Sequence, residues 1–323
     1  MKTTPRQRQR GAALLAAMLT VMLVATFSAS ALWQQWRAAE IESAERARVQ
    51  AAWVLVGALD WSRLILGEDG RAGGSDNLTE PWAVPLEEAR LTTFLSAEKN
   101  VASDSVEGLP DAFLSGRIID AQSKLNVLSL VDAGQPIPAS VATFTRLFNL
   151  LGLPVAELER MTSGLVRALN TTGDGDASAA PLMPQEVSQL VWLGLSPATA
   201  TALEPYVTIL PVRTTLNLNT ASAEAISASM ESLNIASARQ LVERRTRSFF
   251  KDIAAANAAL PSGSAPFNSA QHGVGTSYFE VYGRLRLDRT YVEEHSLLQR
   301  NGVTVTTIWR TRGAGATNTP VKP

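Results

Sequence analysis

The feature that most constrains the fold of this chain is a long uncharged segment directly behind a basic head. The first ten residues include four basic residues and no acidic one, and no charged residue occurs from 11 to 36. The apolar run Ala12–Trp33 has 22 residues, enough for one helix to cross a hydrocarbon core of about 30 Å. Because basic residues favour the cytoplasmic side, the rest of the chain is predicted to be exported.

Three interpretations of this segment differ in the fate of the helix. A secretory signal peptide would be cut at the small residues 29–31, after Ala31, and the helix would be lost. A plain membrane anchor would stay uncut. The segment also resembles a type IV prepilin leader, in which a basic head ends in a glycine, here Gly11, before an apolar helix. That resemblance implies cleavage between Gly11 and Ala12, with the helix retained and its new N-terminus methylated.

The chain beyond Trp36 favours the prepilin interpretation. Residues 37–66 are rich in Ala, Glu and Arg and contain no proline. Apolar residues recur there at spacings of three and four, which is typical of a helix with one buried face: Val49, Ala52, Trp53, Val56 and Leu59. We therefore expect one long helix, embedded in lipid in its first half and packed on protein in its second.

Glycines are expected to end this helix. Gly67 is the first glycine after a continuous apolar stretch, and Gly70, Gly73 and Gly74 follow it closely. Glycine is the residue most often found just past a helix C-terminus, so the helix is predicted to continue to Gly67, with Gly70, Gly73 and Gly74 as its stop. Trp53 and Trp61 are expected in its packing region.

The remaining sequence alternates between strand and helix patterns. Residues 117–130 predict two strands around a tight turn at 121–124. Strand patterns return at 278–287, 292–299 and 303–309, with Asn301-Gly302 as a hairpin signal. Between them, segments that begin after Ser, Thr, Pro or Asn predict helices: 139–151, 154–169, 185–193, 197–207, 221–230 and 235–245.

These elements predict an α+β fold. A long N-terminal helix would pack on an antiparallel sheet, and a large α-helical domain would be inserted between the early and the late strands. The predicted segments are 1–11 (leader), 12–33 (membrane helix), 34–134 and 266–312 (the two parts of the sheet-bearing domain), 135–265 (inserted helical domain) and 313–323 (disordered tail).

Composition argues against catalysis. The chain has no cysteine, so thiolate chemistry is excluded. It has only two histidines, His272 and His295, so few residues could serve as the base of a catalytic triad. The net charge is −1, and the chain beyond the basic head is acidic, which does not suit a nucleic-acid binder. We expect no catalytic residue and no enzymatic activity.

One motif nevertheless invites a nucleic-acid interpretation. LNLNTASAE at 216–224 is similar to the opening of helix-hairpin-helix modules, which need a Gly-x-Gly hairpin to bind phosphate. The matching stretch 231–236 has no glycine. We interpret the motif as a helix cap at Thr220 or Ser222 and expect no nucleic-acid partner. A basic cluster further on is expected to meet protein carboxylates: Arg244, Arg245 and Arg247.

Segments spread over most of the chain carry a family resemblance. They are the leader ending at Gly11, IIDAQSKLNVLSL (118–130), PYVTILP (205–211), LNLNTASAEAISA (216–228), LVERRTRSFF (241–250), and SYFEVYGRLRL before HSLLQR (277–300). In this order they resemble the K-type minor pseudopilins of the bacterial type II secretion system. The resemblance implies a pilin-like fold in an inner-membrane prepilin. It also implies processing by the prepilin peptidase, a periplasmic bulk, and a place at the pseudopilus tip with I- and J-type minor pseudopilins.

Ala16 bears on the place of the subunit in such an assembly. Counted from Ala12, it is the fifth residue, where most pilins and pseudopilins have Glu, thought to neutralise the N-terminal amine of a neighbour. A buried unpaired carboxylate costs several kcal/mol, and a tip subunit has no subunit above it. Ala16 therefore fits a cap, although alanine is common in this segment.

A calcium site is a further expectation. The loop 170–176 alternates oxygen-bearing side chains with glycine, a spacing that can wrap Ca²⁺, and its candidate ligands are Asn170, Asp174 and Asp176. The resemblance implies calcium near the inserted domain, although this loop is less acidic than the family's usual stretch and lacks the final Glu of an EF-hand. A solvated loop is the alternative. Weaker acidic candidates are Asp76, Asp104 and Asp111.

The leading hypothesis is a non-enzymatic tip subunit that initiates and caps a pseudopilus for export of folded proteins across the outer membrane. Its expected partners are the I- and J-type minor pseudopilins, other pseudopilins and the prepilin peptidase, while contact with secreted substrates is left open. One alternative is a minor pilin at the tip of a type IV pilus. A remoter one is a periplasmic hydrolase released by cleavage after Ala31.

Overall fold

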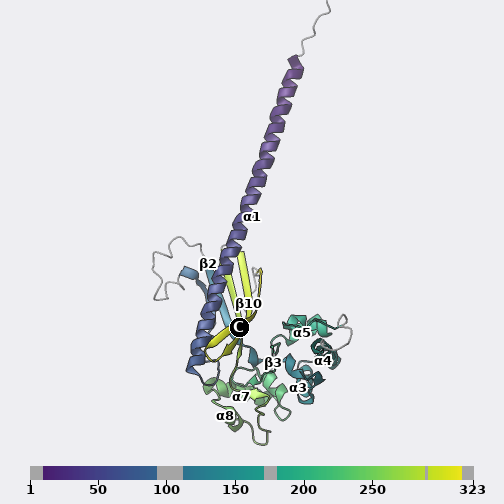
Figure 1. Cartoon of the computed structure of the whole chain (residues 1–323), viewed down its shortest axis with the longest axis vertical. Coiled ribbons are helices and arrows are strands. Elements are labelled where there is room, and N and C mark those ends of the chain that lie inside the picture. The colour runs from purple at the N-terminus through teal and green to yellow at the C-terminus, as the bar shows by residue number, and fades with distance from the viewer. Residues whose placement is uncertain (1–9, 93–111, 171–179, 288–289, 315–323) are drawn as a thin grey trace, which may run out of the picture.

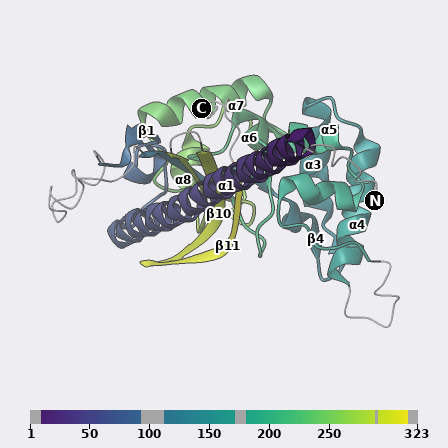
Figure 2. The same cartoon turned by 90° about the horizontal axis from the view of Figure 1, so that it is seen from above.

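A single long helix dominates the shape of the molecule. The computed structural model describes residues 10–92, 112–170, 180–287 and 290–314. Helix α1 (Arg10–Ala72) has 63 residues, and its first half extends away from a body made of a sheet and a group of shorter helices (Figure 1). Seen from above, α1 runs diagonally across the sheet, and the short helices lie to both sides of it (Figure 2). The predicted continuous stem is therefore present.

The second half of α1 packs on the sheet through a stripe that overlaps the predicted one only at Leu59. Ala51, Leu55 and Leu59 are buried, whereas Val49 and Trp53 are 55% and 72% exposed. Apolar residues lie on both faces of this part of the helix, so periodicity alone does not identify the face that meets the sheet. Trp53, which the sequence assigns to the packing region of this helix, does not pack on the sheet.

The helix continues past Gly67 and ends among the glycines predicted to stop it. It ends at Ala72, where Gly73 takes a left-handed φ of 67°, which favours glycine. Gly67 and Gly70 serve close packing instead, because the turn at Gly302 and Val303 lies against them. A Cβ at Gly67 would come within 3.1 Å of the Val303 carbonyl oxygen, and one at Gly70 would overlap the carbonyl oxygen of Gly302.

The sheet has five antiparallel strands in the order β1–β2–β9–β10–β11. The strands are β1 (Leu86–Arg90), β2 (Ala112–Asp120), β9 (Tyr278–Leu287), β10 (Thr290–Asn301) and β11 (Thr304–Ala314). The predicted hairpin at Asn301-Gly302 is confirmed, with Asn301 opposite Thr304. Because β11 continues to Ala314, the first two residues of the predicted disordered tail belong to a strand, and 315–323 lie outside the described residues.

The predicted hairpin within 117–130 is wrong. β2 ends at Asp120 and pairs with β9, not with the segment that follows it. After a short 3₁₀ turn, η3 (Ala121–Ser123), strand β3 (Leu125–Asn126) pairs in parallel with β6 (Val207–Thr208). The chain therefore leaves the sheet after Asp120 and returns at Tyr278.

The inserted unit is mainly helical. Its α-helices are α3 (Pro138–Leu150), α4 (Val155–Leu169), α5 (Pro197–Leu203), α6 (Ala223–Ser229), α7 (Ile235–Arg247) and α8 (Ile253–Ala258). The segment predicted as a helix over 185–193 is a 3₁₀ helix, η6 (Val187–Leu193). The remaining short elements are η1 (Pro81–Ala83), η4 (Val127–Leu130), β4 (Val131–Asp132), β5 (Gln135–Pro136), β7 (Leu216–Asn217) and β8 (His272–Gly273).

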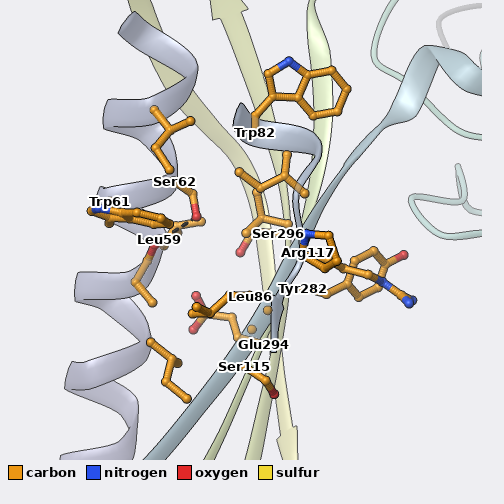
Figure 3. Close-up of a pocket in the computed structure, with 18 of the residues that line it drawn as sticks. Leu59, Trp61, Ser62, Trp82, Leu86, Ser115, Arg117, Tyr282, Glu294 and Ser296 are labelled. Carbon is orange, nitrogen blue, oxygen red and sulfur yellow. Dashed lines mark hydrogen bonds between the residues drawn. The ribbon is translucent and has the colours of Figure 1, made fainter. Parts of the chain in front are cut away.

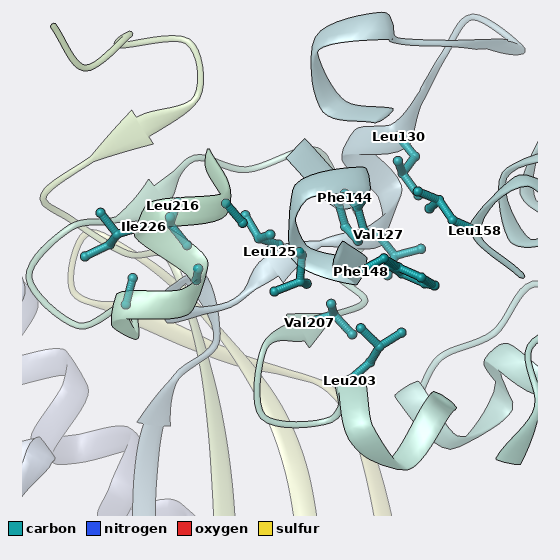
Figure 4. Packing of buried hydrophobic residues seen from close by; sticks show 14 of the residues in the cluster. Leu125, Val127, Leu130, Phe144, Phe148, Leu158, Leu203, Val207, Leu216 and Ile226 are labelled. Atoms are coloured by element: carbon teal, nitrogen blue, oxygen red, sulfur yellow. The ribbon is translucent and has the colours of Figure 1, made fainter. Parts of the chain in front are cut away.

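This unit has a core of its own. The largest buried apolar cluster runs from Leu125 to Phe267 in sequence and contains no residue of α1 or of the five-stranded sheet. Phe144, Phe148 and Val207 lie at its centre (Figure 4). Since Leu125 precedes the predicted boundary at 135, the inserted unit begins earlier than the sequence indicated. The predicted architecture, a long helix on an antiparallel sheet with an inserted helical unit, is confirmed.

Candidate functional site

The most exposed apolar surface of the molecule is the first half of α1. Large side chains in this stretch are mostly uncovered, for example Leu15 at 69% and Phe27 at 70% exposure. Within the described residues, α1 is the one helix long and apolar enough to cross a membrane, with a mean hydropathy of 2.2 in its most apolar window. Trp33 and Trp36 lie at the end of this stretch and are also exposed, as expected for an interfacial aromatic belt.

The predicted processing residues lie at the start of this helix. Arg10 and Gly11 form its beginning, and Ala12 and Ala16 follow as exposed residues. Spaced four apart, Ala12 and Ala16 lie on one face of α1. Neither contacts the protein's own body, so this face is available to neighbouring helices in a bundle.

A second exposed surface lies where α1 crosses the sheet. We call it the stem stripe: Val49, Trp53, Gly57 and Leu64 on the helix face away from the sheet. Trp53 is 72% and Leu64 61% exposed, and no atom lies within 4 Å of the position that a Gly57 Cβ would take. An apolar ridge interrupted by a glycine lets a second helix approach the backbone closely, with Trp53 packing beside it.

A buried acidic group joins the sheet to the inserted unit. Glu280 of β9 is 6% exposed; its Oε2 accepts hydrogen bonds from Lys124 Nζ at 3.1 Å and the Tyr282 hydroxyl at 2.8 Å. The Thr208 hydroxyl lies 3.4 Å from its Oε1, and His295 Nε2 is 3.9 Å away. Burial raises the pKa of Glu280, but Lys124 and the other partners outweigh it, so this pKa lies below its ordinary value.

His295 completes this junction through its ring. It stacks on Tyr282 at 4.1 Å between centroids and meets Trp309 edge-on at 4.8 Å. Burial lowers the pKa of His295 and outweighs the attraction of Glu280. The junction is therefore a neutral imidazole packed against a charged Lys124–Glu280 pair, which suits a structural contact between the two parts.

The LNLNTASAE motif forms a second buried junction. Asn217 is fully buried and donates to Asp120 Oδ2 at 2.8 Å, and the Thr220 hydroxyl donates to the same oxygen at 2.5 Å. Burial raises the pKa of Asp120 to about 6, against these hydrogen bonds. Ser222 caps α6 by accepting from the Ala225 N–H at 3.1 Å. The interpretation of the motif as a cap is confirmed.

The three arginines of the predicted basic cluster differ in exposure. Arg245 is 7% exposed and donates to the Leu218 carbonyl oxygen at 2.6 Å, whereas Arg244 and Arg247 are exposed at the end of α7. Arg245 thus holds the motif in place and is not part of a surface for partner carboxylates. His272 is also buried, with Nε2 2.9 Å from the Ser229 hydroxyl.

An arginine holds the end of α1 against the sheet. The Arg300 guanidinium pairs with both Asp69 and Asp76 and donates to the Thr276 carbonyl oxygen at 3.0 Å. Among the described residues, Asp69, Asp76 and Glu80 are the one acidic group whose oxygens lie close enough, within 4.8 Å, to share a metal ion. Arg300 already supplies the positive charge there, so the group is explained as an ion-pair cluster.

The predicted calcium loop is only partly visible. Asp174 and Asp176 lie outside the described residues, as do Asp104 and Asp111. Asn170 follows the last residue of α4 and its backbone N–H bonds the Val166 carbonyl oxygen at 3.1 Å. A Cβ at Gly134 would lie 2.6 Å from the Asn170 side-chain oxygen, so that side chain packs against the turn between β4 and β5.

Sequence reasoning did not select Glu280, Asp120 or Arg300. The available signal was an acidic residue inside each apolar strand, in SYFEVYG for Glu280 and in RIID for Asp120, because an isolated charge in a buried strand needs a partner. Their partners are far away in the chain, so local pattern could not identify them.

Comparisons with known proteins agree with one another. Family models described as "Type II secretion system (T2SS), protein K" match residues 123–212 and 216–275. Type II secretion system protein K of Pseudomonas aeruginosa is 28% identical over 94% of this chain and 90% of its own length. The protein of the same name from Pectobacterium carotovorum is 26% identical, over 98% of this chain and all of its own.

A solved structure has the same fold. The matched chain belongs to the GspK–GspI–GspJ complex of the enterotoxigenic Escherichia coli type 2 secretion system, with a TM-score of 0.62 and 18% identity. The match covers 83% of this chain and 98% of that one. The family models, the two relatives and the shared fold agree with one another: over most of its length this chain is similar to type II secretion system protein K, the K-type minor pseudopilin.

Proposed function

We propose that this protein occupies the tip of a type II secretion pseudopilus, where it initiates assembly and caps the filament. The observation that carries the proposal is α1, whose first half is exposed and apolar and whose second half bears the stem stripe beside the sheet. Such a helix can leave the membrane and enter a bundle of similar helices without changing its own contacts with the body. The matched structure contains K together with I and J subunits, so I- and J-type minor pseudopilins are the proposed partners.

The proposal includes prepilin processing in the inner membrane. The prepilin peptidase would cut between Gly11 and Ala12, the new N-terminus would be methylated, and the body would lie in the periplasm. An unbroken α1 from Arg10 to Ala72 supports retention of the helix, because cleavage after Ala31 would remove the first third of one continuous element. Other pseudopilins would join the filament below, and contact of the inserted unit with secreted proteins is part of the same proposal.

Ala16 and the inserted unit support the capping role. A shaft subunit would gain from a carboxylate at position five that meets the amine of a neighbour, whereas a tip subunit would bury that carboxylate without a partner. The inserted unit projects from one side of the sheet and adds bulk beyond the pilin-like part (Figure 1). Both features fit a subunit above which no other is added.

The first test is the mature N-terminus of the chain purified from its host's membranes, measured by intact mass and N-terminal peptide mapping. A methylated chain that starts at Ala12 is expected. A chain that starts at Leu32 would refute the proposal, and an uncut Met1 would point to a static anchor.

The second test addresses the tip. Ala16→Glu is expected to reduce co-purification with I- and J-type subunits at least fivefold, with Ala16→Leu as the control that keeps the position apolar. Trp53→Ala should weaken the same capture through the stem stripe, while Val212→Ala, at a 51% exposed site on the inserted unit, should not. Equal capture by all four variants would contradict docking through α1.

Calcium binding by the loop 170–176 is also part of the proposal, with Asn170, Asp174 and Asp176 as ligands. Calorimetry of the full chain with Ca²⁺ and with Mg²⁺, in the wild type and in Asp174→Asn, tests it. A calcium-specific rise in the unfolding temperature that Asp174→Asn abolishes is expected, and an unchanged unfolding temperature in the wild type would exclude the site.

A further inference from the structure

The contact between α1 and the sheet contains a cavity. Its buried apolar residues fall into two separate clusters, one that includes Leu55 and Leu114 and one that includes Leu59 and Trp82. A cavity of about 240 Å³ is lined by members of both clusters. Figure 3 shows it between α1, the turn that carries Trp82, and strands β2, β9 and β10.

Small residues from both layers create this cavity. Gly116 and Gly283 are direct partners across β2 and β9, so the sheet presents no side chain at this point. A Cβ at Gly283 would come within 3.1 Å of the Leu55 side chain. From the other layer α1 contributes Ala58 and Ser62. Four small residues therefore line the cavity, and at Gly283 the missing side chain lets Leu55 approach the sheet closely.

The cavity lining is mostly apolar and includes four buried polar residues, Ser62, Ser115, Glu294 and Ser296, of which the last two bear on binding. Ser296 is 0% exposed, and its hydroxyl has no hydrogen-bond partner within the described part of the chain. Glu294, which is 5% exposed, binds Arg312 through Oε2, with Nε at 2.9 Å. Its Oε1 accepts no hydrogen bond from the described residues. A buried hydroxyl without a partner is uncommon in folded proteins, and here two acceptors border the same space.

We propose that this cavity binds a small aromatic molecule that carries one N–H or O–H donor. A cavity of about 150 Å³ lined by Leu, Ile and Phe side chains is enough for benzene, so the larger volume here suits an indole-sized ring. Leu55, Leu59 and Trp82 provide the apolar contacts, and Ser296 with Glu294 accepts the hydrogen bond of the ligand. This inference does not depend on the proposed place of the protein in the secretion machinery.

The test uses the full chain in detergent micelles with indole as the probe, and differential scanning calorimetry and saturation-transfer NMR as the readouts. Indole also partitions into micelles, so the signal is the difference from Ser62→Leu, which fills the cavity and keeps the membrane helix. The Ser62 hydroxyl bonds only its own helix, at Ala58, so the substitution leaves no other group unpaired. Ala58→Leu is the second filling variant if Ser62→Leu does not fold.

Saturating indole is expected to raise the unfolding temperature of the wild type by about 2 °C or more and to leave the filled variants unchanged. Ser296→Ala should weaken indole binding about fivefold without affecting benzene, which has no donor. An equal shift in wild type and filled variants, or none in the folded wild type, would overturn the proposed site. Equal indole affinity in Ser296→Ala would overturn the role of the donor.

A third probe separates a free molecule from the side chain of a neighbouring protein. N-acetyl-tryptophanamide carries the same ring with flanking amides, which would have to leave through the opening of the cavity. We expect it to bind at least tenfold more weakly than indole. Affinity equal to that of indole would overturn the assignment to a free small molecule and assign the cavity to a tryptophan of a partner.

Discussion

Gly57 and Gly70 lie on the same helix in opposite environments. Gly57 faces outward with no atom within 4 Å of a Cβ position, and a Cβ at Gly70 would overlap the Gly302 carbonyl oxygen in the β10–β11 turn. Glycine in a helix interior is about 0.5–1 kcal/mol less favourable than alanine. Gly57 therefore lowers the stability of α1 and leaves the helix surface open. Gly70 is required because a larger residue would overlap the β10–β11 turn.

Opposite effects of two identical substitutions follow from this difference. Gly57→Ala is expected to raise the free energy of unfolding by about 0.5–1 kcal/mol, and Gly70→Ala to lower it by about 2 kcal/mol or more because backbone must move. Denaturant unfolding of the full chain in detergent measures both, with the fluorescence of the buried Trp82 as a probe. Two changes of the same sign would contradict the assignment.

Asp120 gives a pH dependence at the residue scale. Burial raises its pKa from 3.8 to about 6, so the folded state binds a proton more tightly than the unfolded chain. Its contribution to stability is therefore greatest below pH 4 and decreases as the pH rises towards 6. Asp120→Asn removes this titration. The stability of the wild type relative to Asp120→Asn should fall by about 2 kcal/mol between pH 4 and pH 7. A constant difference across this range would contradict a raised pKa.

At the scale of elements, capping and turn residues located some ends correctly, whereas apolar periodicity did not identify the buried face of α1. Asn234 caps α7, accepting from the Ser237 N–H at 2.9 Å, so the predicted start at Ile235 is correct. The Asn301-Gly302 turn fixed the β10–β11 hairpin in the same way. Which face of α1 meets the sheet depends on distant residues, and both faces are apolar, so the predicted stripe shares only Leu59 with the buried one.

In the candidate site, too, residues whose partners are distant in the chain could not be identified from the sequence. Ala12 and Ala16 could be selected from the resemblance to a prepilin leader, because the residues that carry it are consecutive in the chain. Glu280 could not, since Lys124 and His295 come from two other segments and meet it only in the folded chain. Long-range ion pairs leave little trace in a single sequence beyond one charged residue inside an apolar strand.

The Lys124–Glu280 pair connects the segment that leaves the sheet with strand β9. Lys124→Met would leave a buried carboxylate without its cation, at a cost of about 3 kcal/mol at neutral pH. The loss should be smaller at acidic pH, because the pKa of Glu280 would then rise and the group would be neutral. The control is Arg46→Met at the exposed pair with Glu42, expected to cost less than 1 kcal/mol. Equal costs at both sites would contradict the buried pair.

The whole molecule consists of two cores joined by a small contact. The α1–sheet core and the core of the inserted unit share no buried apolar residue. A small cluster joins them: Ala121, Leu210, Tyr278 and Leu297. The polar junctions at Glu280 and Asp120 lie beside this contact. Each part therefore buries its own apolar surface, as expected of units that fold separately.

The positions where the chain leaves and re-enters the sheet allow a direct test of this division. Asp120 and Phe279 are direct antiparallel partners on β2 and β9, so a two-residue turn can join them. Replacing 121–278 with Asn-Gly, which favours a type I′ turn, would convert the two strands into a hairpin. The shortened chain is expected to keep α1 on the five-stranded sheet, because that core loses none of its apolar residues.

Three measurements check this expectation on the shortened chain in detergent. It should unfold in one cooperative transition, keep the shifted emission of buried Trp82, and show hydrogen-exchange protection in β9 and β10. Its pH dependence between 4 and 6 should be weaker than that of the full chain, because Asp120 would be exposed and lose its raised pKa. An aggregated chain, or one without protection in β9, would mean that the inserted unit is needed to form the sheet, and the two cores would then have to be treated as one folding unit.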